Sequence, residues 1–194
     1  MARPKAFNRD AALQAAMALF WKQGYEATST DDLLKAMGIG RQSLYDTFGD
    51  KHRLYLEALE LYNSSRVAEH GANHSDDASP LAALEAILFA IADADPAAHA
   101  IGCMGINAIC EFGQSDPAVA AISHGSNEQM LTTLEGILRA AKAKGEVAAN
   151  LDEKQAAQFI SAILAGMKVR EKAGDDTQQL RAVATFALDS LRAS

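Results

Sequence analysis

The sequence is poor in cysteine, proline and aromatic residues. Of its 194 residues, two are cysteine, four are proline and 6% are aromatic. On a single helix, the seven-residue spacing of Cys103 and Cys110 would separate their Cα atoms by about 10 Å, which is too far for a disulfide. Runs of alternating β-branched residues are also missing, while apolar residues recur with helical spacing along nearly the whole chain. These patterns predict an all-α protein without a disulfide framework.

Long apolar stretches are absent as well. No run reaches the roughly 18 apolar residues that a membrane-spanning helix needs, and the basic start of the chain lacks the apolar core of a signal peptide. Apolar residues make up 49% and charged residues 22% of the chain, values typical of a folded globular protein. We therefore expect no membrane association and a cytoplasmic location.

Charge is unevenly distributed along the chain. The formal net charge is −7, yet residues 1–54 sum to +2 and the remaining residues to −9. A polyanion would be attracted to the N-terminal part and repelled by the rest. A difference of this size also fits ordinary surface variation, so by itself it does not identify a nucleic-acid-binding protein.

Capping residues mark the ends of the first helices. Asn8 is an N-cap candidate, and Ser29 followed by Asp32 resembles a capping box. Gly24 is expected to end the first helix in the left-handed conformation, which glycine adopts without strain, and Gly38 is expected to end the second.

The clearest break in the chain is the polar segment 71–79, which ends in a serine followed by proline, a pattern typical of a helix start. We predict an N-terminal three-helix domain over 1–54 and a larger helical domain over 55–194. Further helices are expected near 41–48, 51–70, 80–94, 102–113, 116–144, 152–172 and 175–192.

A helix-turn-helix is the motif that points to a function. Two short predicted helices are joined by the glycine-containing turn Gly38-Ile39-Gly40, and polar residues follow at the start of the second helix. In such a motif the N-terminal end of the second helix reaches base edges in the major groove. Arg41 can fork onto guanine and Gln42 can pair with adenine through two hydrogen bonds, with Ser43 beside them. A solvated helix face is the alternative for these three residues.

Other residues near this helix suit the DNA backbone. Tyr45, Thr47 and Lys51 can contact phosphate oxygens, which set the register without reading sequence. Ser29, at the start of the first helix of the motif, completes the predicted DNA-binding set. Asp46 is unexpected because phosphates would repel its carboxylate. It can accept from cytosine N4 or pair with Arg53 or Lys51, and we favour the intramolecular pair.

The stretch from Phe7 to Leu61 resembles the DNA-binding domain of the tetracycline-repressor (TetR) family. Gly40 departs from the common pattern, which has serine there, but glycine is itself an acceptable N-cap. The resemblance implies a DNA-binding head, a connecting helix and an all-α body that dimerises and binds a small-molecule effector, acting as a repressor of transcription. It rests on Ala16, Leu19-Phe20, Gly24-Tyr25, Ala27-Thr28-Ser29, Leu33, Met37-Gly38-Ile39, Ser43-Leu44-Tyr45, Phe48, Lys51 and Leu54.

An effector site is expected in the helical body. Asn107 interrupts an apolar stripe on the predicted helix 102–113 and needs a partner, which a neighbouring helix or an effector could supply. Cys103, at the start of that helix, could be a reactive thiol or an inert small hydrophobe. For Phe89, Met104, Met130 and Met167, plain core packing is the alternative to effector binding. The predicted effector-binding residues are Phe89, Cys103, Met104, Asn107, Cys110, Met130 and Met167.

The last two predicted helices are candidates for a homodimer interface. Residues 152–172 are apolar on two sides, with Phe159, Ala162 and Gly166 opposite the side of Ile160 and Met167. On the final helix, the apolar stripe of Leu180, Val183, Ala184, Ala187, Leu188 and Leu191 is expected to join a bundle with twofold symmetry. Double-stranded operator DNA would then be read at half-sites about 34 to 36 Å apart.

Two other classes of protein are less well supported. An enzyme would need a nucleotide-binding or catalytic motif, and the glycines of 38–40 lack both the third glycine and the preceding strand of a dinucleotide site. His70 and His74, with Asp76 and Asp77 nearby, have metal-ligand spacing on a segment that glycine interrupts, and His99 has no evident catalytic partner. We expect no enzyme activity, cofactor or metal. A helical dimer that no longer binds DNA is the second alternative, which Arg41, Gln42 and Lys51 disfavour.

Overall fold

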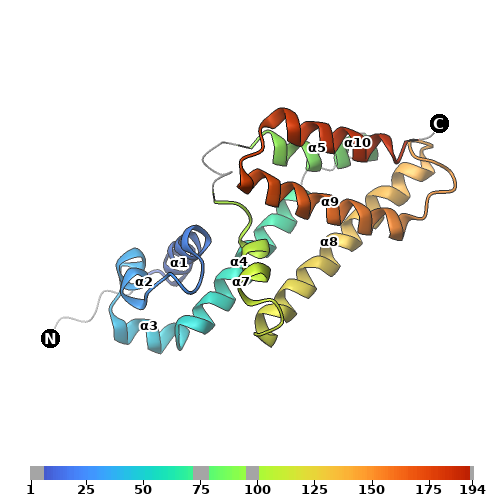
Figure 1. Ribbon diagram of the computed structural model, residues 1–194. Helices are drawn as coiled ribbons and strands as arrows, with labels where there is room; N and C mark the ends of the chain where they lie inside the picture. The colour runs from blue at the N-terminus through green and yellow to red at the C-terminus, as the bar shows by residue number, and fades with distance from the viewer. Residues whose placement is uncertain (1–6, 72–78, 95–100, 193–194) are drawn as a thin grey trace. The chain divides into compact units, whose positions relative to one another are not determined.

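The computed structural model describes residues 7–71, 79–94 and 101–192, and these residues form helices joined by short loops (Figure 1). The only β-type pairing within them is an isolated antiparallel bridge between Val147 and Arg192. The prediction of an all-α fold is confirmed, and the predicted helices match the observed ones to within a turn. The helices are α1 (Arg9–Gln23), α2 (Thr30–Met37), α3 (Arg41–Phe48), α4 (Lys51–Gly71), α5 (Pro80–Ala92), α7 (Met104–Phe112), α8 (Pro117–Ala143), α9 (Glu153–Ala173) and α10 (Thr177–Asp189).

The predicted N-caps hold the starts of their helices. The side chains of Asn8, Ser29 and Ser79 accept hydrogen bonds from backbone N–H groups in the first turns of α1, α2 and α5. Gly38 ends α2, as predicted, and does so in the left-handed conformation. Gly24 ends α1 with a φ of 81° but a ψ of 175°, so its backbone lies outside the left-handed helical region and still requires glycine.

The described residues fall into two compact units. The head unit comprises residues 7–64 and 103–123, and the body unit comprises the described parts of 65–102 and 124–192. The head unit therefore includes α7, whose Met104 and Ala108 are buried in the same cluster as Phe20, Leu44 and Tyr55. The units differ from the predicted division at residue 54 because 103–123 packs with the N-terminal helices. The division by function into 1–54 and 55–194 stays a prediction.

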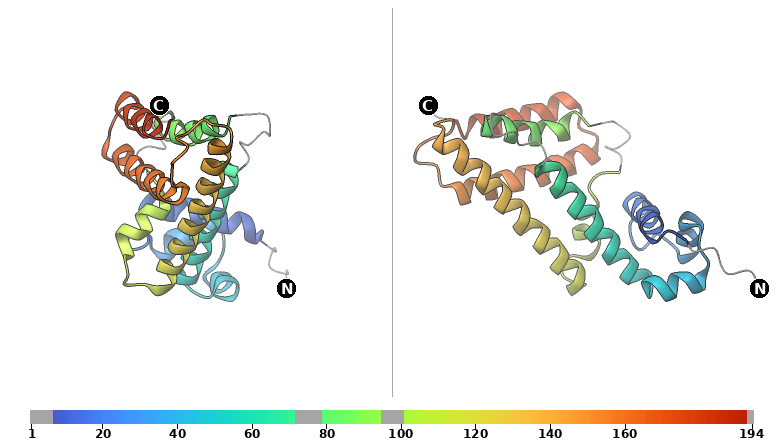
Figure 2. Two further views of the ribbon diagram at one scale, coloured as in Figure 1. Left: turned by 90° about the vertical axis from the view of Figure 1, so that its right-hand side faces the viewer. Right: turned by 180° about the vertical axis from the view of Figure 1, so that it is seen from behind.

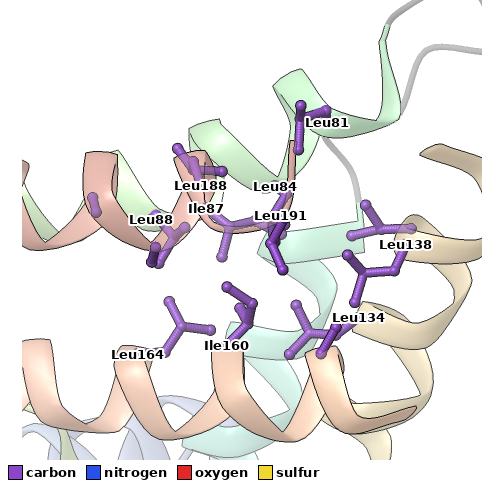
Figure 3. Close-up of a cluster of buried hydrophobic side chains, with 14 of the residues drawn as sticks. Leu81, Leu84, Ile87, Leu88, Leu134, Leu138, Ile160, Leu164, Leu188 and Leu191 are labelled. Carbon is purple, nitrogen blue, oxygen red and sulfur yellow. The ribbon is translucent and has the colours of Figure 1, made fainter. Parts of the chain in front are cut away.

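The core of the body unit lies between α5, α9, α10 and the C-terminal part of α8. Leucine and isoleucine side chains from these helices point toward one another and exclude water (Figure 3). The three helices α5, α9 and α10 remain side by side in both further views (Figure 2), as their mutual contacts require. The labelled core residues include Leu84 and Leu88 of α5, Leu134 of α8, Ile160 of α9 and Leu188 of α10.

The two apolar sides of α9 have different surroundings. Ile160 and Met167 are buried in the core of the body unit, whereas Phe159 is 40% and Val169 is 52% exposed. Ala162 and Gly166, which were predicted to lie with Phe159, are exposed as well. One apolar side of α9 thus builds the core and the other faces outward in this single chain.

The stripe that we expected α10 to offer to a partner lies instead in the core of its own chain. Leu180 and Leu188 are 0% and 2% exposed, and both belong to the body-unit cluster. The prediction of that stripe as an intermolecular surface is wrong, because α5 and α9 of the same chain cover it. The outward side of α10 instead carries Phe186, which is 77% exposed.

Two further expectations concern membranes and metals. Among the described residues, no helix is both long and apolar enough to span a membrane. No group of three or more potential metal ligands gathers in the part of the chain that the structure describes. His74, Asp76, Asp77 and His99, together with the side chain of His70, lie outside the described residues.

Candidate nucleic-acid interface

Helices α2 and α3 form the helix-turn-helix. Gly38, with φ 66° and ψ 30°, turns the chain out of α2, and Gly40 begins α3 without a side-chain cap. Leu33 of α2 and Leu44 and Phe48 of α3 are buried in the core of the head unit. This anchoring leaves Gln42, Tyr45 and Asp46 of α3 exposed, and Arg41 is exposed as well because it is the first residue of the helix.

Arg41 is held by a residue of the preceding helix. Its Nη2 lies 2.6 Å from Oδ1 of Asp31, and both side chains are more than half exposed. One ion pair between α2 and α3 thus fixes the guanidinium at the start of α3. A guanidinium has five N–H donors, so this contact leaves donors for a second acceptor such as a guanine edge.

Gln42 is paired with Asp46 one turn along the same helix. Its Nε2 donates to Oδ1 of Asp46 over 2.8 Å, and both residues are exposed. The prediction that Asp46 pairs with Arg53 or Lys51 is wrong, because Asp46 pairs with Gln42 instead. Residues four apart on a helix lie above one another, which brings Asp46 to Gln42.

The other predicted DNA-binding residues lie around this exposed face. Tyr45 is 46% exposed, whereas Ser43 and Thr47 are half-buried. Ser29 caps α2, accepting from the N–H of Asp32 over 3.1 Å and donating to its carboxylate over 2.5 Å. That hydrogen bond from Ser29 lowers the pKa of Asp32 below its ordinary value, because it stabilises the ionised carboxylate.

Lys51 rests on an aromatic ring. Its Nζ lies 4.1 Å from the centre of the Tyr25 ring, a cation–π geometry. Tyr25 in turn packs against the rings of Tyr55 and Phe112. Burial, followed by nearby carboxylates, raises the pKa of the Tyr25 hydroxyl, so the ring stays neutral under the ammonium group.

A carboxylate of α7 binds the turn between α1 and α2. The backbone N–H groups of Tyr25 and Glu26 donate to the two oxygens of Glu111 over 3.0 and 2.7 Å. Gly24 permits this approach, because a Cβ there would lie 3.2 Å from one of these oxygens. The turn that leads into the helix-turn-helix is thus held by a residue more than eighty positions away.

Arg9, one of the basic residues of the N-terminal part, makes its contacts within the protein. Arg9 pairs with Glu57 over 2.5 Å, and its guanidinium lies 4.9 Å from the centre of the Phe48 ring. This arginine therefore ties α1 to α3 and α4. Arg3 and Lys5 lie outside the described residues.

Comparisons with known proteins match both parts of the chain. The family model described as bacterial regulatory proteins, tetR family, matches residues 12–58, and the model described as tetracyclin repressor-like, C-terminal domain, matches residues 80–187. The chain belongs to the TetR family. It is thus a DNA-binding transcriptional regulator, and membership of this family confirms the expectation that it is not an enzyme.

Individual TetR relatives cover three quarters or more of the chain. The transcriptional repressor ComR of Escherichia coli is 33% identical over 188 residues, which cover 96% of this chain and 90% of ComR. The uncharacterized regulator YezE of Bacillus subtilis is 35% identical over 150 residues, 76% of each chain. A cysteine-substituted form of the TetR regulator CifR, solved with 26-bp operator DNA, has a TM-score of 0.83 and 28% identity over 98% of this chain and 100% of its own.

The predicted effector-binding residues divide between the two units. Cys103, Met104, Asn107 and Cys110 belong to the head unit, and Phe89, Met130 and Met167 belong to the body unit. Met104 and Met167 are each 1% exposed and pack in separate cores, whereas Cys110 is exposed. Asn107 is half-buried and Cys103 borders the head-unit core. The set as an effector site stays a prediction.

Three residues of this TetR head, Asp31, Glu111 and Asp116, were missed by the sequence analysis, because their partners lie in other segments of the chain. Asp46 was considered, and its partner Gln42 could have been found from their spacing of four on one helix. The helix-turn-helix geometry itself gives a weak signal for Asp31, since α2 must lie close to the start of α3.

Proposed function

We propose that this TetR regulator binds a pseudo-palindromic operator as a homodimer, with α3 of each protomer in the major groove. The observation that carries the proposal is the exposed N-terminal end of α3, where the side chains of Arg41 and Gln42 are exposed while Leu44 and Phe48 further along the helix are buried. Their donors and acceptors suit guanine and adenine edges. The similarly folded regulator CifR was solved with double-stranded operator DNA, which supports operator binding by this chain.

The outward side of α9 and α10 is the surface that we assign to the dimer. It carries three large exposed apolar side chains, Phe159, Val169 and Phe186. Small residues between them, Ala162 and Gly166, would let a partner helix approach closely. Exposed apolar patches of this kind favour burial against a second protein surface, and a twofold axis would pair the patch with its own copy.

We further propose that a small-molecule effector releases the regulator from its operator, and that the protein acts in the cytoplasm, where the DNA is. Release requires that the effector prefer a conformation with the two heads wrongly spaced. Helix α7 carries three of the predicted effector-binding residues and a fourth, Cys103, is its N-cap, while its Glu111 binds the turn before α2. A shift of α7 would therefore be transmitted to the helix-turn-helix through two backbone hydrogen bonds.

The operator is found first by selecting bound fragments from random double-stranded DNA. Affinities of the variants for the selected site and for random DNA are then measured at two salt concentrations. Arg41→Ala should lose about 1 to 3 kcal/mol per half-site and relax the base preference at one position. Lys51→Ala should weaken all sequences alike and lower the salt dependence by about one counterion.

Lys22→Ala is the matched control, since it removes one exposed positive charge from α1 of the same head unit. It should leave the base preference unchanged. Equal losses on operator and random DNA for Arg41→Ala would contradict the assigned role of Arg41. Screening small molecules for release of the labelled operator then tests the effector proposal separately.

A further inference from the structure

The hydrogen bond between Gln42 and Asp46 defines which way the Gln42 amide faces. A carboxylate only accepts hydrogen bonds, so the group 2.8 Å from Oδ1 of Asp46 must be the amide nitrogen. The amide oxygen Oε1 is then left without a contact to that carboxylate oxygen and is open to another donor. This orientation follows from the chemistry of the pair and needs no choice between the two atoms of the amide.

The paired amide keeps the groups that adenine needs. An amide has two N–H donors and one acceptor oxygen, and Asp46 uses only one of the donors. The remaining N–H and Oε1 form a neighbouring donor and acceptor, which match N7 and N6 of adenine in the major groove. We propose that Asp46 is a specificity-determining residue, which holds the Gln42 amide in the orientation that reads adenine. The inference rests on the proposed function, in which Gln42 reads a base.

A positioning role has a different signature from simple charge repulsion. Asp46 is exposed on the same side of α3 as Gln42 and puts a negative charge near the phosphates, so its removal strengthens binding to every sequence. Loss of the hydrogen bond between Gln42 and Asp46 also frees the Gln42 side chain and allows its amide group to rotate by half a turn. The preference for adenine then falls while the affinity for random DNA rises, and repulsion alone cannot produce these opposite changes.

The test uses the full-length protein and the operator obtained by selection. Wild type, Asp46→Ala and Asp46→Asn are titrated against operators with each of the four base pairs at the Gln42 position, and against random DNA. Ordering of one polar side chain is worth about 0.5 to 1.5 kcal/mol, so each Asp46 variant should reduce the adenine preference about 2- to 12-fold. Asp46→Asn should lose the adenine preference as Asp46→Ala does. The asparagine amide can offer either its oxygen or its nitrogen to Gln42 and so does not define which way the Gln42 amide faces.

Glu26→Gln is the matched control, because it removes one exposed carboxylate from the same head unit. It should leave the adenine preference intact. Circular dichroism and thermal unfolding confirm that each variant is folded at the assay temperature.

Gln42→Ala separates the two proposals. If it leaves the base preference unchanged, Gln42 does not read DNA and the role assigned under the proposed function fails. If it abolishes the preference while both Asp46 variants retain it, the inference about Asp46 is overturned. If an Asp46 variant instead loses a preference for cytosine at a neighbouring base pair, Asp46 reads a base directly. That result also overturns the inference that Asp46 orients Gln42.

Discussion

His52 and Asp116 join the start of α4 to the start of α8. Nε2 of His52 lies 2.5 Å from Oδ2 of Asp116. The other carboxylate oxygen accepts from the N–H groups of Ala118 and Val119 in the first turn of α8. The Asp116 carboxylate thus caps α8 and also contacts His52 of α4. Both contacts lie in the head unit, which carries the helix-turn-helix.

Asp116 should make the head unit less stable in acid. The hydrogen bond from His52, followed by those from the backbone, lowers the pKa of Asp116 below its ordinary value of 3.8. A carboxyl with a lowered native pKa contributes its full stability above the unfolded value and loses it as the pH falls through the native pKa. Asp116→Asn should therefore have a lower Tm than wild type near pH 6, and the difference should shrink below about pH 4.

Asp116→Ala provides the comparison, because asparagine retains a capping oxygen and alanine does not. The alanine variant should unfold at a lower temperature than the asparagine variant. A Tm difference between wild type and Asp116→Asn that stays constant from neutral to acid pH would argue against a stabilising ion pair.

Glu111→Gln should loosen the turn between α1 and α2. Glutamine has one acceptor oxygen where glutamate has two, so one of the N–H groups of Tyr25 and Glu26 loses its partner. A hydrogen bond to an exposed charged group is worth about 1 kcal/mol, and the amide left unpaired should exchange about fivefold faster with solvent. Hydrogen exchange measured by NMR checks this result. Gln114→Ala, at an exposed neighbouring position, should leave the exchange of both amides unchanged.

Tyr25 should support DNA binding through the charge of Lys51. Tyr25→Leu removes the ring beneath the ammonium group and should weaken binding to all sequences a few-fold, since an exposed cation–π contact is worth about 0.5 to 1 kcal/mol. The salt dependence should stay near that of wild type because the charge remains. Tyr25→Phe keeps the ring and should bind as wild type does. A loss in the phenylalanine variant equal to that in the leucine variant would assign the effect to the hydroxyl instead.

Phe186→Glu should separate the proposed dimer without unfolding the chain. The side chain is 77% exposed in the single protomer, so the substitution should change monomer stability by no more than about 0.5 kcal/mol. A charge buried in an apolar interface should weaken the dimer by about 2 kcal/mol or more, roughly 30-fold. Analytical ultracentrifugation measures the change, and operator affinity should fall with it.

Ile109→Glu is the control for this substitution, because Ile109 is a large exposed apolar residue of α7, outside the proposed interface. It should sediment as wild type does. If Phe186→Glu also remains a dimer over the same concentration range, the outward side of α10 is not the interface.

Sequence patterns predicted the helices of this protein because helix signals are local. Asn8, Ser29 and Ser79 cap the helices they were predicted to cap. Each interaction involves residues three positions apart, so the amino acids nearby carry the information. The buried Leu44 and Phe48 likewise follow from helical periodicity, and so does the exposure of Gln42, whereas Arg41 is exposed because it begins the helix.

Contacts between distant segments could not be predicted in this way. Glu111 and Tyr25 lie 86 positions apart, and no local pattern distinguishes Glu111 from other exposed glutamates. The surroundings of α10 illustrate the same difficulty. Its apolar stripe was correctly found, but periodicity shows only that a stripe must be buried and not which surface covers it.

The amino-acid sequence alone determined the all-α class, the helix-turn-helix and the residues at the exposed start of α3, because these depend on spacing within one or two helices. Tertiary structure decided that Asp31 holds Arg41, that α7 packs in the head unit and that Phe186 rather than Leu188 faces outward. Packing selects among surfaces of similar hydrophobicity by shape and distance, and these become defined only when the helices meet.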